Sequence, residues 1–177
     1  ILLAKNLDEF EEVGRKAVRV IVYKGKNKID TIREQIGKRG YAVGFEGLID
    51  WINGQLPANE EIGRAFRSET RMYPEIAIRE LVANAIIHQD FSEKGFPMIE
   101  IFSDRIEISN PGIPLITPQR FIDEYVSRNE RLADVLRRFG MCEEKGSGID
   151  KVIFYNEMYQ LPAVDFIVSE KRTRITL

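Results

Sequence analysis

The chain has one cysteine and one histidine among its 177 residues. Because a disulfide needs two cysteines, Cys142 cannot form one within the chain, and one histidine with one cysteine excludes an ordinary zinc cage. The sequence has no run of about 18 apolar residues, so it predicts no membrane-spanning helix. The first residues, "ILLAKNLDEF", become charged too early for a signal peptide, and we expect a cytoplasmic protein without membrane contact.

Neither sign of charge dominates the sequence, since 26 Lys and Arg residues face 28 Asp and Glu residues and the formal net charge is -2. This balance, with no stripe of basic and aromatic residues, disfavours direct nucleic-acid binding. A hydrophobic content of 44% and a charged content of 31% suit one globular domain with a substantial core. The chain has no initiator Met and its last residues, "RTRITL", read as an unfinished strand, so we expect a domain of a longer protein.

Alternation of apolar and polar residues predicts three strand regions. Residues 17–25 are β-branched and end at a glycine, which indicates a strand. Residues 98–112 predict a hairpin of two half-buried strands around a two-residue Ser103-Asp104 turn, and residues 164–177 predict a closing hairpin.

Capping and stop signals predict the helices. Thr117 and Asn129 are expected as N-caps of two short helices, the second of which ends at Gly140. We expect the remaining helical segments over residues 29–40, 44–57, 74–88 and from about 148 onward, with a connecting helix and loop over 58–71.

The helix containing "ELVANAIIHQDF", residues 80–91, carries an unusual polar stripe. Glu80, Asn84 and His88 recur every four residues and share one face. Burying them without partners would cost on the order of 1–3 kcal/mol each, so partners are expected. An Asn carbonyl can bind hydrated Mg²⁺, and a Glu one turn earlier can orient or deprotonate water. Alternatively, Glu80 pairs with Arg79 or another basic group, Asn84 bonds a neighbouring loop, and His88 is a partly exposed helix-end residue.

Two glycine-containing turns accompany this stripe. Gly146-Ser147-Gly148 precedes a helix, where free N–H groups and the positive end of the helix dipole can meet a phosphate, although a plain turn has the same sequence. Asn110-Pro111-Gly112 follows an expected strand and can equally be a simple turn.

In this order the motifs resemble the GHKL group of ATP-binding domains, which includes the gyrase B subunit, heat-shock chaperones, histidine kinases and MutL-type mismatch-repair proteins. The segments "RELVANAIIHQDFSEKGFPMIEIFSDRIEISNPG" and "GMCEEKGSGIDKV" are most similar to the RecG-helicase-C-terminal-like ATP-binding domain of bacterial transcriptional regulators. The resemblance is strongest over residues 74–156. It implies an α/β two-layer sandwich with a mixed, mostly antiparallel sheet and helices on one face.

The resemblance also implies roles for individual residues. Glu80 matches the water-activating Glu, Asn84 the Mg²⁺-binding Asn, and Asn110 the position that accepts from the adenine amino group. A lid is expected from Ile113 to Lys145. Gly112 matches the glycine two residues after the Asn110 position, and Gly146, Ser147 and Gly148 match the turn over the phosphates. Arg128 and Lys145 lie nearest the glycine turns in the sequence and are expected to contact phosphate, and His88 and Ile113 complete the nucleotide-binding candidates.

This chain departs from the family pattern at three places, one of which is a phosphate turn with fewer glycines than most members have. Asn110 replaces the usual Asp, which keeps an acceptor but loses its charge. The residues after Gly112 are "IPL", without the second glycine of the usual motif. We therefore expect slow or absent ATP hydrolysis.

The function implied is an ATP-binding regulatory module of a bacterial transcriptional regulator, with ATP and Mg²⁺ as ligands. Its nucleotide-binding core would span residues 74–177, preceded by a strand and helices in residues 1–73, and DNA would be contacted only through other domains. The alternative is a ligand-free domain of the same fold that serves dimerisation or another interaction. In that case Glu80 and Asn84 would bond internally and the lid would form a homodimer surface.

Overall fold

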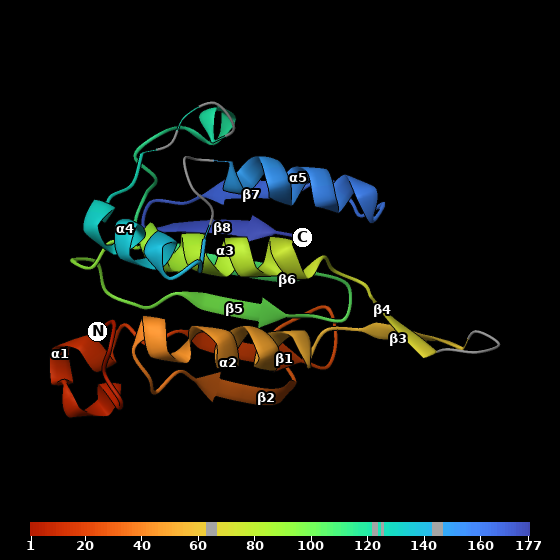
Figure 1. The fold of residues 1–177 in the computed structure, drawn as a ribbon, viewed down its shortest axis with the longest axis horizontal. Coiled ribbons are helices and arrows are strands. Elements are labelled where there is room, and N and C mark those ends of the chain that lie inside the picture. The colour runs from red at the N-terminus through yellow and green to blue at the C-terminus, as the bar shows by residue number, and fades with distance from the viewer. Residues whose placement is uncertain (63–66, 122–123, 125, 143–146) are drawn as a thin grey trace.

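The computed structural model of the protein describes residues 1–62, 67–121, 124, 126–142 and 147–177 (Figure 1). Its main layer is a six-stranded sheet in the order β2-β1-β5-β6-β8-β7. β1 and β5 are parallel, and all other neighbours in this sheet are antiparallel. The strands are β1 (Arg19–Tyr23), β2 (Thr31–Ile36), β5 (Met98–Ile101), β6 (Ile106–Pro111), β7 (Asp165–Val168) and β8 (Arg172–Thr176). The expected mixed, mostly antiparallel sheet is confirmed.

Helices form the second layer. The helices α2 (Tyr41–Asn53), α3 (Glu75–Ile87) and α5 (Gly148–Met158) lie across one face of the sheet (Figure 1). Their inward side chains and the alternate residues of the central strands make one core, which includes Phe45, Ile78, Leu81, Ile99 and Ile106. The expected two-layer α/β sandwich is therefore confirmed. Shorter helical elements are η1 (Leu7–Glu9), α1 (Glu11–Gly14), η2 (Pro118–Arg120) and α4 (Glu130–Arg138).

The central hairpin forms where the sequence predicts it. The Phe102 amide donates to the Arg105 carbonyl at 2.9 Å, which closes the turn at residues 103 and 104. The expectation of half-buried strands is wrong, because β6 is buried along its whole length. Glu100 and Glu107, on the face opposite the isoleucines, are 3% and 5% exposed.

Charged partners make this burial tolerable. Glu100 contacts Lys28 Nζ at 2.7 Å and accepts from the Tyr23 hydroxyl at 3.0 Å. Glu107 contacts Arg105 Nε at 2.8 Å and the Arg174 guanidinium at 3.1 Å. The alternating pattern predicts that solvent surrounds the two carboxylates on this face. In the structure their protein partners take the place of that solvent.

Residues 29–40 do not form the expected helix. Residues 31–36 instead form β2, which pairs antiparallel with β1 from Arg19↔Ile36 to Tyr23↔Thr31. All six residues of β2 are exposed, so no buried stripe distinguishes a helix from a strand here. Pairing with β1 therefore overrides the moderate helix propensity of this segment.

The segment 58–71 also differs from the prediction of a connecting helix and loop. It contains β3 (Ala58–Ile62) and β4 (Arg67–Arg71), an antiparallel two-stranded sheet that projects from the body of the domain (Figure 1). Antiparallel pairing lets alternate residues of the two strands exchange backbone hydrogen bonds. A polar composition does not distinguish such a hairpin from a loop.

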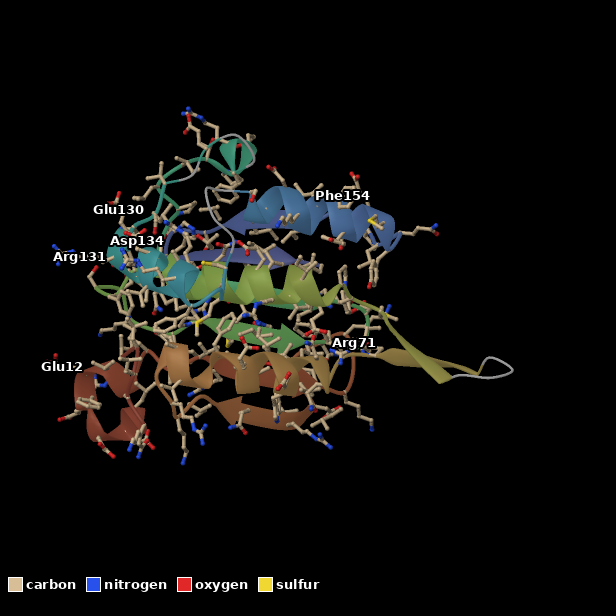
Figure 2. The ribbon with its side chains drawn as sticks, viewed as in Figure 1. Glu12, Arg71, Glu130, Arg131, Asp134 and Phe154 are labelled. Atoms are coloured by element: carbon tan, nitrogen blue, oxygen red, sulfur yellow. The ribbon has the colours of Figure 1, made fainter. Side chains whose placement is uncertain are left out.

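The segment between β6 and α5 contains less helix than predicted in its first half. Thr117 precedes the three-residue 3₁₀ helix η2, without a side-chain cap bond, and residues 122, 123 and 125 lie outside the described part. The second helix is confirmed as α4, with Asn129 at its N-cap position and Gly140 at a φ of +66° just beyond its end. Figure 2 shows Glu130, Arg131 and Asp134 projecting outward from α4, so these charges belong to an exposed face.

None of the helices in the described ranges is both long and apolar enough to cross a membrane.

Candidate nucleotide-binding site

A cavity opens between α3, the ends of β6 and β8, the start of α5 and the segment that follows β6. Three groups of sequence-predicted residues line it: Glu80, Asn84 and His88 from α3, Asn110 from β6, and Gly148 from α5. The fold therefore gathers motifs that are up to 68 residues apart in the chain, from Glu80 to Gly148, around one space.

The polar stripe of α3 faces this cavity. Glu80 is 6% exposed, and the Asn84 side-chain amide donates to Glu80 Oε1 at 3.3 Å. Arg79 does not pair with Glu80, because its guanidinium contacts Glu46 at 2.7 Å instead. The amide nitrogen of Asn84 is thus turned toward the carboxylate, which leaves Asn84 Oδ1 to accept another bond.

Glu80 lies directly against the first residue of α5. A Cβ atom added to Gly148 would lie 1.8 Å from Glu80 Oε1 and 2.4 Å from its Cδ, so only a glycine fits there with Glu80 in place. The N-terminal end of a helix carries unsatisfied N–H groups and a partial positive charge. The Glu80 carboxylate therefore lies at the partly positive end of α5.

Of the expected phosphate turn, the structure describes Ser147 and Gly148. Ser147 is the N-cap residue of α5, without a side-chain bond to its own helix. Lys145 and Gly146 lie outside the described residues, so their predicted roles stay predictions.

Asn110 lies at the other end of the cavity and is 7% exposed. Its side-chain nitrogen donates to the His88 carbonyl at 3.3 Å and to the Pro111 carbonyl at 3.2 Å. In the described part of the chain no donor meets Asn110 Oδ1. The amide therefore presents its oxygen as the acceptor that remains for another molecule.

Gly112 allows the chain to turn tightly beside this amide. Its φ is +99°, and an added Cβ atom would lie 2.7 Å from the Asp90 Cβ. The Asp90 amide also donates to the Pro111 carbonyl at 2.8 Å. The glycine is thus required both by its backbone conformation and by the close approach of the two loops.

Arg128 and Ile113 do not line the cavity. Arg128 contacts Asp90 Oδ2 at 3.0 Å and donates to the Ile113 carbonyl at 2.7 Å, while the Ile113 side chain is 50% exposed. Burial lowers the pKa of His88 to about 4, and the positive charge of the nearby Arg128 guanidinium contributes to the same shift. His88 is therefore neutral at physiological pH.

Sequence reasoning missed several residues of the site. Thr173 lies opposite Asn110 in the β6–β8 pairing, lines the cavity and donates through Oγ1 to the Gly112 carbonyl at 3.0 Å. Its only sequence signal is its place in the closing hairpin, which gives no register with β6. The apolar walls were also missed, since they read as ordinary core or lid residues: Leu81, Ile87, Ile108, Leu115, Ile116, Phe121, Val126 and Ile175.

The two ends of the cavity differ chemically. Apolar walls and one oriented amide suit a flat heterocycle at the Asn110 end, whereas the α5 N-terminus and Asn84 Oδ1 suit phosphates and a cation at the Glu80 end. No group of three acidic, His or Cys side chains among the described residues could bind a metal by itself. Mg²⁺ commonly takes one or two protein oxygens together with phosphates and water, so Asn84 fits a Mg²⁺ ion that arrives with a nucleotide.

Comparisons with known proteins agree with this architecture. The DIP2311 protein from Corynebacterium diphtheriae, a solved structure, is similar over 94% of this chain with a TM-score of 0.83 and 18% sequence identity, which concerns the fold alone. The chain spans 35% of that protein's length. No curated protein matches the chain.

A family comparison concerns the sequence directly. Residues 95–177 match the family described as "ATP-dependent DNA helicase recG C-terminal". This region contains Asn110, Gly112 and the turn before α5, and it begins after α3. The resemblance to the RecG C-terminal-like ATP-binding domain is therefore confirmed, and residues 95–177 carry the match to that family.

Proposed function

We propose that the chain is an ATP-binding module that takes its nucleotide together with Mg²⁺ in the cavity between α3, β6 and α5. One observation carries this proposal: the N-terminal end of α5, an Asn84 amide oxygen that accepts from none of the described residues and an oriented acceptor on Asn110 line one cavity with apolar walls. The match of residues 95–177 to an ATPase-like family supports the same ligand class.

Each part of the nucleotide has a complementary group. Asn110 Oδ1 accepts from the adenine amino group, and the apolar walls contact the faces of the base. The N–H groups at the start of α5 bind phosphate, and Asn84 supplies one oxygen to Mg²⁺. Glu80 orients a water next to the phosphates, and with Asn110 in place of a carboxylate turnover is slow or absent.

Thermal unfolding of the chain with and without ATP and Mg²⁺ tests this proposal. A ligand that binds only the folded state at 100 times its Kd stabilises that state by about 2.7 kcal/mol. This is a shift in Tm of several degrees for a chain of this size. Asn84→Ala is the matched variant, because it removes only the proposed Mg²⁺ oxygen and one long hydrogen bond, and its Mg²⁺-dependent shift should be smaller.

A second candidate function is a ligand-free interaction domain with the same fold. The observation that favours it is the position of Glu80, whose carboxylate already lies against the start of α5. An unchanged Tm with millimolar ATP, ADP and Mg²⁺, together with a concentration-dependent dimer in sedimentation, would support this candidate and contradict nucleotide binding.

The biological role that we propose is regulatory. In this proposal the module responds to ATP within a bacterial transcriptional regulator whose DNA-contacting part lies elsewhere in a longer protein. The measurement is the DNA affinity of the full-length regulator with and without ATP. An affinity that does not change when ATP is bound would contradict the regulatory role without contradicting nucleotide binding.

A further inference from the structure

Side-chain amides bind the carbonyls at the end of α3. Four consecutive carbonyls, from residue 86 to residue 89, each accept a hydrogen bond from an Asn or Gln side chain. Gln89 donates to the Ile86 carbonyl at 3.0 Å and Asn110 donates to the His88 carbonyl at 3.3 Å. The carbonyls at the end of a helix lack intrahelical partners, so these amides determine how its last peptide groups are oriented.

Asn129 supplies the two shortest of these bonds. Its Nδ2 donates to the Ile87 carbonyl at 2.7 Å and to the Gln89 carbonyl at 2.8 Å. These two carbonyls belong to the residues before and after His88. The Asn129 amide therefore fixes the backbone on both sides of the His88 carbonyl, which accepts from Asn110.

The position of Asn129 makes this arrangement unexpected. It occupies the N-cap position of α4, where an Asn side chain usually accepts from its own helix, yet it makes no such cap bond. The neighbouring Arg128 reaches the same region through Asp90 and the Ile113 carbonyl. The middle of the predicted lid, at Arg128 and Asn129, is thus tied by its side chains to the region at the end of α3.

The orientation of Asn110 depends on that fixed carbonyl. If its amide rotated by 180°, Oδ1 would face the His88 and Pro111 carbonyl oxygens and two hydrogen bonds would be replaced by repulsion. With the nitrogen held in place, Oδ1 accepts from the amino group of adenine. Guanine carries a carbonyl oxygen at that position and is disfavoured by the same orientation.

We propose that Asn129 is a positioning residue for base selection: by holding the Ile87 and Gln89 carbonyls it keeps the His88 carbonyl where it orients the Asn110 amide. This inference rests on the proposed nucleotide binding. It assigns part of the base specificity to a residue that does not line the cavity.

The experiment is a titration of ATP and of GTP, each with Mg²⁺, into the parent chain and into Asn129→Ala. We expect the variant to lose about tenfold in the ratio of ATP to GTP affinity, with GTP affinity changed by less than about threefold. Asn129→Ser, which keeps a good N-cap residue but is too short to reach both carbonyls, should lose the preference similarly and serves if the alanine variant does not fold. Asn27→Ala, a matched truncation in an exposed turn, should leave both affinities unchanged.

The outcomes separate this inference from the proposed function. Equal weakening of ATP and GTP, or an unchanged ratio, would overturn the positioning role while leaving nucleotide binding intact. A parent chain that binds neither nucleotide would contradict the proposed function and this inference with it. A selective loss of ATP preference is the result that a purely structural role for Asn129 does not produce.

Discussion

Replacing Gly148 with alanine should destabilise the protein, although alanine normally stabilises a helix. In a helix interior alanine is favoured over glycine by about 1 kcal/mol. At Gly148 the added Cβ atom would lie 1.8 Å from Glu80 Oε1 and 2.9 Å from its Cγ, so the buried carboxylate must move. Forcing an extra carbon into a packed site costs about 1–3 kcal/mol, and so close an approach to Glu80 places this substitution toward the upper end of that range, above the gain in helix propensity. We expect Gly148→Ala to lower the free energy of unfolding by about 1–2 kcal/mol.

Urea denaturation of four chains measures this effect: the parent, Gly148→Ala, Glu80→Ala and the double variant. Because Glu80→Ala removes the obstructing carboxylate, Gly148→Ala should be neutral or stabilising in that background. The coupling between the two positions should then be about 2–3 kcal/mol. Gly47→Ala is the matched control, since Gly47 lies inside α2 and nothing lies within 4 Å of its added Cβ atom. A Gly148→Ala chain as stable as the parent, or more stable, would refute the reasoning about Glu80 and α5.

Four further predictions concern the same cavity. Gly112→Ala should cost about 2 kcal/mol or more in urea denaturation, because its φ is +99° and the new Cβ atom would lie 2.7 Å from that of Asp90; a smaller cost would contradict the close approach. Because burial lowers the pKa of His88 to about 4 from an ordinary 6.5, the unfolded chain binds its proton first, and stability should fall by up to about 3 kcal/mol as the pH drops from 6.5 toward 4. His88→Gln should flatten that dependence, and an equally steep profile would contradict the assignment. Asn84→Ala should unfold within about 1 kcal/mol of the parent, since its one described bond is 3.3 Å long, while losing Mg²⁺-dependent ATP affinity in calorimetry. Asn110→Ala should reduce discrimination between ATP and GTP by about 1–3 kcal/mol, and an unchanged preference would place base recognition elsewhere.

Local signals in the sequence were sufficient for much of the site. The four-residue spacing of Glu80, Asn84 and His88 places all three on one helical face, and the structure has that face on the cavity. The central hairpin and the stop at Gly140 were also predictable, because alternation and glycine stops act over a few neighbouring residues. The fold class followed from the resemblance, which the match of residues 95–177 confirms.

Long-range partners were decided only by the tertiary structure. Residues 31–36 form β2 because the edge of β1 is available for pairing. The local sequence of residues 31–36 does not predict this pairing. Thr173 faces Asn110 because of the register between β6 and β8, which depends on how the whole sheet assembles.

The tertiary structure also decided which residues contact the sequence-predicted motifs. Asn129 bonds to the carbonyls of Ile87, at the end of α3, and of Gln89, about 40 residues earlier in the chain. Arg128 reaches Asp90 in the loop after α3 and the Ile113 carbonyl after β6. A residue's type states which bonds it can make, whereas the packing of α3, β6 and α4 decides which atoms come within reach. The sequence by itself therefore determined the chemistry of the polar stripe and the strand end, and the tertiary structure decided which groups orient them.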